Sequence, residues 1–254
     1  MTDCGSDLPS AAQRISRVSG SFGSILHNLS EGDGMTEYLI RNADYIAAVK
    51  TPALCSEETA DGRGFCNLLA AENAGFLAPV YRLDRGVGGV MLYARTPDAA
   101  AFFSALVRDH ALEKEYVAVL CGKPEEPVGE LRDLLYYDRA KNKSYVVKKA
   151  RGGVKEAILT YRTLGTWTDA ESGHPRTLVA VRLQTGRTHQ IRVQFASRGL
   201  PLLGDRRYGG EADPAGRDIS LWCRSVTLPA YREHPSVHLV SEAPFGKEIA
   251  DYVD

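Results

Sequence analysis

Asp84 is the acidic residue whose neighbours most suggest chemistry. It lies between Arg82 and Arg85 in residues 79–95, which continue through three glycines into an apolar run at residues 90–94. An apolar run bounded by glycine is typical of a buried strand, so we expect the carboxylate on a loop that enters the core. A carboxylate held beside guanidinium groups can act as a nucleophile or a base. The commoner role of an isolated aspartate is that of a turn residue in a surface ion pair.

Four other residues are candidates for chemistry, namely Tyr116, Arg187, His189 and Gln190. No GxSxG motif is present, so a hydrolase triad that uses His189 is not expected. The six histidines are scattered without ligand spacing, and the five cysteines form no CxxC pair, so we expect neither a metal site nor a disulfide framework. The glycines after Asp84 precede a strand and not a helix, which argues against a dinucleotide cofactor.

The composition is that of an ordinary globular protein, with 44% hydrophobic and 25% charged residues among 254. A net charge of -1 argues against a protein that coats nucleic acid through a general basic excess. A local basic surface is still possible, because residues 139–155 carry seven basic side chains and no acidic one. Such a run is more often a solvated hairpin than a phosphate-binding face. No apolar run is long enough to cross a membrane and no signal-peptide core is found, so we expect a soluble, cytoplasmic protein.

The elements that would position the candidate residues are mainly strands. Residues 1–35 are rich in Ser, Gly and Asp, and are expected to form a weakly ordered extension. Strands are predicted at residues 38–40, 45–49, 90–94, 114–122, 157–164, 177–183, 219–226 and 237–240. Helices are predicted within residues 56–76, from Thr96 to about residue 110, at 189–197 and at 245–253. Strands that outnumber helices and follow one another in hairpins predict an α+β fold with a mixed, mainly antiparallel sheet.

Several segments together resemble the RluA family of pseudouridine synthases, over residues 37–230. Residues 81–85, YRLDR, resemble the family's catalytic motif, and residues 114–118, KEYVA, are similar to its Lys/Tyr strand. Residues 152–157, GGVKEA, resemble its next hairpin, and residues 183–193, LQTGRTHQIRV, are the closest match of all. Several motifs in the same order are more specific than any one of them.

The resemblance implies one catalytic domain at residues 36–254, with no separate RNA-binding module, no cofactor and no metal. It implies conversion of uridine in ribosomal or transfer RNA to pseudouridine, and we expect a monomer. Asp84 would be the catalytic carboxylate, Arg187 the guanidinium that keeps it ionised, and Tyr116 the platform on which uracil stacks. The RNA-binding residues would be Arg82, Arg85, Lys114, Lys148, Lys149, Lys155, His189, Gln190 and Arg192.

Two departures from the family pattern bear on activity. The family usually has a Thr-Ser pair where this chain has Val87 and Gly88, and a histidine where it has Tyr81. Loss of the hydroxyls removes local hydrogen bonds, and glycine adds backbone freedom, so we expect a less rigid loop after Asp84. An RNA-binding paralogue with impaired catalysis is therefore an alternative, and a structural or interaction protein of the same fold is a third.

Overall fold

The computed structural model describes residues 36–213, 216 and 218–246. The extension predicted for residues 1–35 and most of the helix predicted for residues 245–253 lie outside these ranges. Residues from Thr36 onward belong to one compact unit. Over the described ranges, no helix combines the length and the apolar character needed to cross a membrane.

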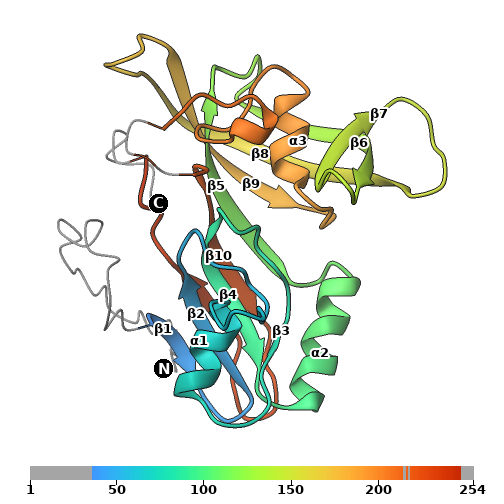
Figure 1. The fold of residues 1–254 in the computed structure, drawn as a ribbon, viewed down its shortest axis with the longest axis vertical. Helices are drawn as coiled ribbons and strands as arrows, with labels where there is room; N and C mark the ends of the chain where they lie inside the picture. Colours follow the sequence, from blue (N-terminus) through green and yellow to red (C-terminus); the bar gives the residue numbers. More distant parts are fainter. Residues whose placement is uncertain (1–35, 214–215, 217, 247–254) are drawn as a thin grey trace, which may run out of the picture. The chain divides into compact units, whose positions relative to one another are not determined.

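One mixed sheet contains the eleven strands of the described chain (Figure 1). Its order is β1-β2-β4-β10-β5-β9-β8-β6-β7, with β3 paired to β4 and β11 to β10. The strands are β1 (Tyr38–Arg41), β2 (Tyr45–Lys50), β3 (Ala78–Pro79), β4 (Gly88–Ala94), β5 (Glu113–Cys121), β6 (Val128–Asp138), β7 (Lys143–Val147), β8 (Val154–Thr168), β9 (Pro175–Leu183), β10 (Leu221–Leu228) and β11 (Val237–Val240). Among these pairings only β4 with β10 is parallel, which confirms the predicted α+β fold with a mainly antiparallel sheet.

Three α-helices and one 3-10 turn accompany the described strands. They are α1 (Phe65–Glu72), α2 (Pro97–Arg108), α3 (Gln190–Ala196) and the turn η1 (Arg206–Tyr208). The predicted start of α2 is confirmed, because the Thr96 side chain accepts the backbone N–H of Ala99 at 3.1 Å and Pro97 is the first helical residue. In Figure 1, α1 lies near β1 and β2 and α2 lies beside β4 on the side away from β1, whereas α3 lies over the β6 to β9 part of the sheet. The site is formed where loops from these two parts meet.

The opening hairpin is confirmed, and its turn has a local cause. Asn42 Oδ1 accepts the backbone N–H groups of Asp44 and Tyr45 at 2.9 and 2.8 Å, which turns the chain from β1 into β2. Strand β6 was not predicted. Its sequence VGELRDLLYYD alternates only as far as Arg132, because the polar Asp133 lies on the face of Leu131 and Leu135 and the four residues after it are all apolar.

Candidate active site

Two cavities meet at the carboxylate of Asp84, on the loop between β3 and β4. Their volumes are about 480 and 820 Å³. The walls of both include Glu57, Arg82, Leu83, Asp84, Thr188, His189 and Arg192. The side chain of Asp84 is 28% exposed, so its carboxylate can be approached from either cavity.

The Asp84 loop is fastened by the segment between β2 and α1. Ser56 Oγ donates to the Leu83 carbonyl at 2.8 Å and accepts the Leu83 N–H at 3.0 Å. Lys50 Nζ is fully buried and donates to three backbone carbonyls, one of which is that of Arg85 at 3.4 Å. Burial lowers the pKa of Lys50 to about 8. Neither Ser56 nor Lys50 was a predicted site residue, although a lysine that ends an apolar strand is a signal of a buried cation.

Arg192 provides the guanidinium that contacts Asp84. It lies on α3, with a side chain only 6% exposed, and Nη1 donates to Asp84 Oδ2 at 2.7 Å. Its Nε and Nη2 donate to the two oxygens of Asp205 at 2.7 and 2.9 Å, which is a bidentate pair. Burial opposes the charge of Arg192, but the hydrogen bonds and negative charges of the two aspartates raise its pKa. Arg192 therefore stays charged and fixes the carboxylate of Asp84.

The prediction that Arg187 pairs with Asp84 is wrong. Arg187 lies before α3 and its Nε donates to the backbone carbonyl of Glu156 on β8 at 2.9 Å. The chain reverses at His189, which has a left-handed φ of 54°, so residues on either side of it face different neighbours. Arg187 lines the smaller cavity only. The available signal was the place of Arg192 between Ile191 and Val193, because a buried arginine requires an acidic partner.

Gln190 and Arg192, two predicted RNA-binding residues, form hydrogen bonds within the protein. Arg192 donates three hydrogen bonds to its two aspartates, and Gln190 is 3% exposed. Gln190 Oε1 accepts from the Thr185 hydroxyl and the Arg187 N–H at 2.8 and 2.9 Å, and its Nε2 donates to the Ile158 carbonyl at 3.1 Å. These bonds hold the turn before α3, and RNA binding by Gln190 and Arg192 stays a prediction.

His189 lies beside the carboxylate of Asp84 and is largely buried. Its side chain is 7% exposed, Nδ1 is 2.9 Å from the hydroxyl of Tyr208, and Nε2 is 3.7 Å from Asp84 Oδ2. Burial lowers the pKa of His189, against the opposing effect of the Asp84 charge. A mainly neutral imidazole at pH 7 is the consequence.

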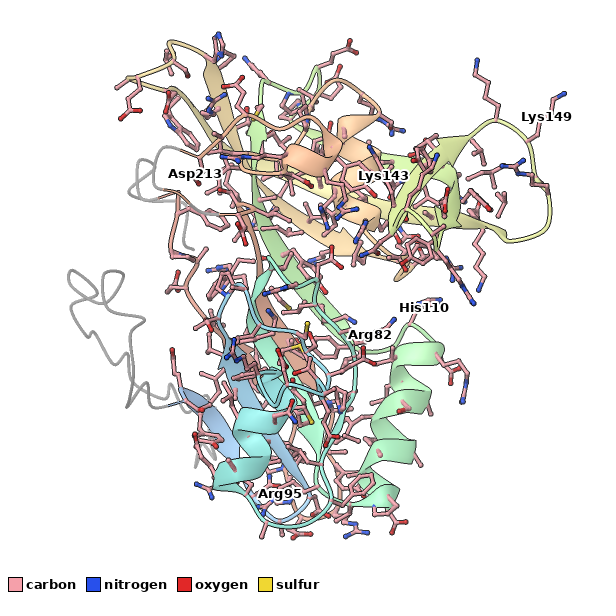
Figure 2. The ribbon with its side chains drawn as sticks, viewed as in Figure 1. Arg82, Arg95, His110, Lys143, Lys149 and Asp213 are labelled. Carbon is pink, nitrogen blue, oxygen red and sulfur yellow. The ribbon has the colours of Figure 1, made fainter. Side chains whose placement is uncertain are left out.

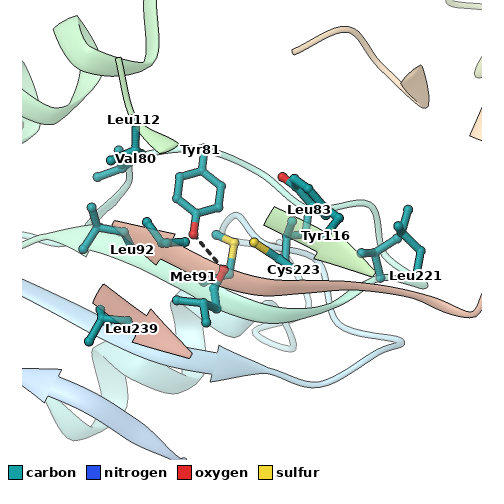
Figure 3. Packing of buried hydrophobic residues seen from close by; sticks show 14 of the residues in the cluster. Val80, Tyr81, Leu83, Met91, Leu92, Leu112, Tyr116, Leu221, Cys223 and Leu239 are labelled. Atoms are coloured by element: carbon teal, nitrogen blue, oxygen red, sulfur yellow. Dashed lines mark hydrogen bonds between the residues drawn. The ribbon is translucent and has the colours of Figure 1, made fainter. Parts of the chain in front are cut away.

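The smaller cavity has an aromatic and cationic wall. Tyr116 and Lys114 lie two residues apart on β5, so both face this cavity, as does Tyr81. Lys114 Nζ is 4.4 Å from the centre of the Tyr81 ring, and burial lowers the pKa of this lysine. Figure 3 shows Tyr81 and Tyr116 on either side of the buried Cys223. Burial also raises the pKa of the Tyr116 phenol well above its ordinary value.

The remaining predicted RNA contacts divide into near and distant residues. Arg82 and Arg85 line the larger cavity and are exposed; Arg82 pairs with Glu57 at 3.2 Å, and Arg85 Nε donates to the Ala53 carbonyl at 2.9 Å. The exposed lysines Lys148 and Lys149, on the loop between β7 and β8, and Lys155, near the start of β8, line neither cavity. Figure 2 shows Lys149 at the outer end of the loop between β7 and β8. They could contact only RNA that extends beyond the site.

Gly88 and Val87 do not form the loose loop that was predicted. Val87 is buried and its N–H donates to the Asp84 carbonyl at 2.9 Å, which closes the turn. Gly88 is the first residue of β4 and lies under Trp222, where a Cβ would be 2.2 Å from the indole ring. Tyr81 is buried, and its hydroxyl donates to the Val90 carbonyl at 2.7 Å (Figure 3). The loop after Asp84 is therefore held at both ends.

One group of side chains in the described ranges has the spacing of metal ligands, and it lies outside both cavities. Asp44, Glu233 and His234 each bring one ligand atom within 4.8 Å of the others. Arg232 Nη1 already contacts Asp44 at 2.9 Å. The guanidinium occupies the position that a cation would take, so the group is better explained as an ion pair that holds residues 231–234 to the β1–β2 turn.

Comparisons with known proteins agree on one family. A model of the family described as RNA pseudouridylate synthase matches residues 44–197. An uncharacterised RNA pseudouridine synthase of Zymomonas mobilis is 33% identical over 174 residues, which are 68% of this chain and 74% of the relative. A protein of Borreliella burgdorferi named ribosomal large subunit pseudouridine synthase D is 31% identical over 149 residues, 59% of this chain and 43% of its own.

The chain spans less than half the length of some curated relatives that it matches, and most of others. Among solved structures, human RNA pseudouridylate synthase domain containing 1 has a TM-score of 0.69 at 20% identity, covering 87% of this chain and 89% of its own. This likeness confirms the fold. Because the family model matches more than half of the chain, the predicted resemblance is also confirmed, and this chain belongs to the RNA pseudouridylate synthase family.

Proposed function

We propose that this protein isomerises uridine in RNA to pseudouridine, with Asp84 as the reacting carboxylate. The observation that carries the proposal is the position of Asp84 between two cavities, with Oδ2 held by the buried Arg192 at 2.7 Å. Within the described residues, no hydrogen bond is made to Oδ1 of Asp84. That oxygen is available for substrate, while the guanidinium of Arg192 holds Oδ2 in place.

The two cavities differ in what they can hold. The smaller one has the flat ring of Tyr116 and the apolar side chain of Leu221 in its wall, which suits a uracil base that has left its stack. The larger one is lined by the exposed Arg85, Arg206 and Arg207, which suit the phosphates on either side of the target nucleotide. Asp84 lies between them, where the ribose of a bound uridine would lie.

The chemistry requires an ionised carboxylate in either of two roles. Asp84 attacks C1′ of the ribose as a nucleophile, or it removes the proton of C2′ as a base. Arg192 serves both by holding the charge and the direction of the carboxylate before RNA binds, which avoids reorganisation during the reaction. We further propose ribosomal or transfer RNA as substrate, a cytoplasmic location and a monomeric state.

The test is pseudouridine formation in uridine-containing ribosomal and transfer RNA by the purified protein. Asp84→Asn should bind RNA with an affinity close to that of the wild type and form no pseudouridine. Asp218→Asn is the matched control, because Asp218 is an exposed aspartate in the wall of the same larger cavity. Activity that survives Asp84→Asn would refute the assigned role, and equal binding with no product from the wild type would support the RNA-binding alternative.

A further inference from the structure

Lys114 presents a half-buried cation to the smaller cavity without an acidic partner. Among the described residues, no carboxylate forms an ion pair with its Nζ, and its one close aromatic contact is the Tyr81 ring at 4.4 Å. Its neighbour Glu115 is on the opposite face of β5 and pairs with Arg182 and Arg224. Removing an ammonium from water in part without an acidic partner is unfavourable, which suggests that its partner arrives with the substrate.

The alternation of β5 aligns this cation with the proposed base platform. Lys114 and Tyr116 are two residues apart and point to the same face, and both share the wall of one cavity with Asp84. A group beside the platform and the carboxylate would lie at the edge of a uracil stacked on Tyr116. Uracil carries carbonyl oxygens at that edge, which an ammonium can contact.

The proposed reaction develops negative charge on the uracil. Whether Asp84 attacks C1′ or takes the C2′ proton, the N1–C1′ bond breaks and its electron pair goes to the uracil, where the charge spreads over N1, O2 and O4. The uracil then turns, C5 forms the new bond to C1′, C5 loses its proton and N1 gains one. In the first route the C1′–carboxylate bond breaks as C5 attacks, and in the second the C2′ proton is returned. The uracil anion is therefore common to both routes.

We infer that Lys114 is a catalytic residue whose ammonium stabilises the uracil anion during cleavage of the N1–C1′ bond. This inference rests on the proposed function. A fixed charge aimed at the place where charge develops in a water-poor cavity acts mainly on the transition state. Because burial lowers the pKa of Lys114, an anion beside it restores the charged form and gains the full interaction. The sequence predicted Lys114 as an RNA-binding residue. In the inferred role, its ammonium contacts the uracil and not a phosphate.

Two RNA substrates whose uracil anions differ in stability distinguish a lysine that stabilises the anion from one that contacts a phosphate. RNA with uridine and the same RNA with 5-fluorouridine at the target are compared in single turnovers, by the loss of the starting nucleoside. Fluorine stabilises the uracil anion and prevents loss of a proton from C5, so the fluorinated RNA reports cleavage and rearrangement alone. Lys114→Met should slow the uridine RNA about 100-fold or more, the size typical of losing one charge-stabilising group, and the fluorinated RNA less than about 10-fold.

Two further variants complete the experiment. Lys114→Arg keeps the cation and should retain activity within about 10-fold. Lys123→Met, an exposed lysine two residues after β5, is the matched control for the loss of a lysine and should change neither substrate. Equal slowing of both RNAs by Lys114→Met would refute the inference, as would a loss that is entirely in RNA affinity, which indicates a phosphate contact. If the wild type forms no pseudouridine at all, it is the proposed function that fails.

Discussion

Gly88→Ser is expected to destabilise the protein, although it restores the residue that the family usually has at this position. A Cβ at Gly88 would lie 2.2 and 2.7 Å from two carbons of the Trp222 ring and 2.9 Å from the Lys50 carbonyl. Gly88 and Trp222 are paired directly between the parallel strands β4 and β10. Neither strand can move away without breaking its other pairings, so the indole must shift.

The magnitude follows from what the indole loses. Overpacking a core costs about 1 to 3 kcal/mol. Trp222 is buried and its Nε1 donates to the Ser241 carbonyl at 3.2 Å, and losing that bond adds about 1 kcal/mol. The free energy of unfolding should therefore fall by about 2 to 4 kcal/mol, with a decrease in Tm of about 4 to 16 °C for a chain of this size.

Urea unfolding and a double-mutant cycle test this reasoning. Gly152→Ser is the matched control, because nothing lies within 4 Å of a Cβ there, and it should change the free energy of unfolding by less than about 0.5 kcal/mol. In a Trp222→Leu background, which removes the ring, Gly88→Ser should cost much less than in the wild type. A neutral Gly88→Ser, or an equal cost in both backgrounds, would refute the proposed clash.

Three other predictions concern the groups that hold Asp84 and its loop. Arg192→Met should abolish pseudouridine formation and lower the free energy of unfolding by about 3 to 5 kcal/mol, because Asp205 becomes a buried unpaired charge; urea unfolding and nucleoside analysis measure both effects. Ser56→Ala should cost about 1 to 3 kcal/mol by leaving the buried N–H of Leu83 unbonded, and should lower kcat more than RNA affinity; Ser56→Thr is the control that keeps the hydroxyl. The pKa of Lys50 is about 8 in the folded protein and 10.5 ordinarily, so the unfolded chain binds more protons between pH 8 and 10.5. The free energy of unfolding should therefore rise with pH across this window, by about 3 kcal/mol more in the wild type than in Lys50→Met. Identical pH profiles of the two proteins would contradict the assignment.

The fold was largely predictable because local signals and the global arrangement agree. The hairpin at Asn42, the cap at Thr96 and the β-branched run of β5 each act within a few residues, and short-range patterns identify them. Strand β6 escaped prediction because Asp133 on its inner face and the apolar run after it break the alternation. The order of strands, in which β10 separates β4 from β5, depends on pairings between residues more than 100 positions apart, which no local pattern encodes.

The site was predictable in its residue types but not in its pairings. Asp84 and Tyr116 line a common cavity as expected, while the choice between Arg187 and Arg192 was made wrongly. Both arginines lie in one eleven-residue segment, and which of them reaches Asp84 depends on the left-handed turn at His189. A positive φ at a residue other than glycine is set by tertiary contacts, so it leaves little trace in a sequence.

The cations around Asp84 are either buried or exposed. The buried ones hold the Asp84 loop and its carboxylate, whereas the exposed ones are available to bind RNA phosphates. Lys50 and Arg192 are buried and bonded to the Asp84 loop or to carboxylates, so they cannot also neutralise RNA phosphates. Affinity must come from exposed residues such as Arg85 and Arg207, in a chain whose net charge is -1. Each phosphate contact steepens the salt dependence of binding, so Arg207→Ala should reduce the slope of log affinity against log salt by about 1. Arg192→Lys, which keeps a charge that makes no phosphate contact, should leave that slope unchanged while lowering the rate, and an altered slope would show that Arg192 contacts RNA after all.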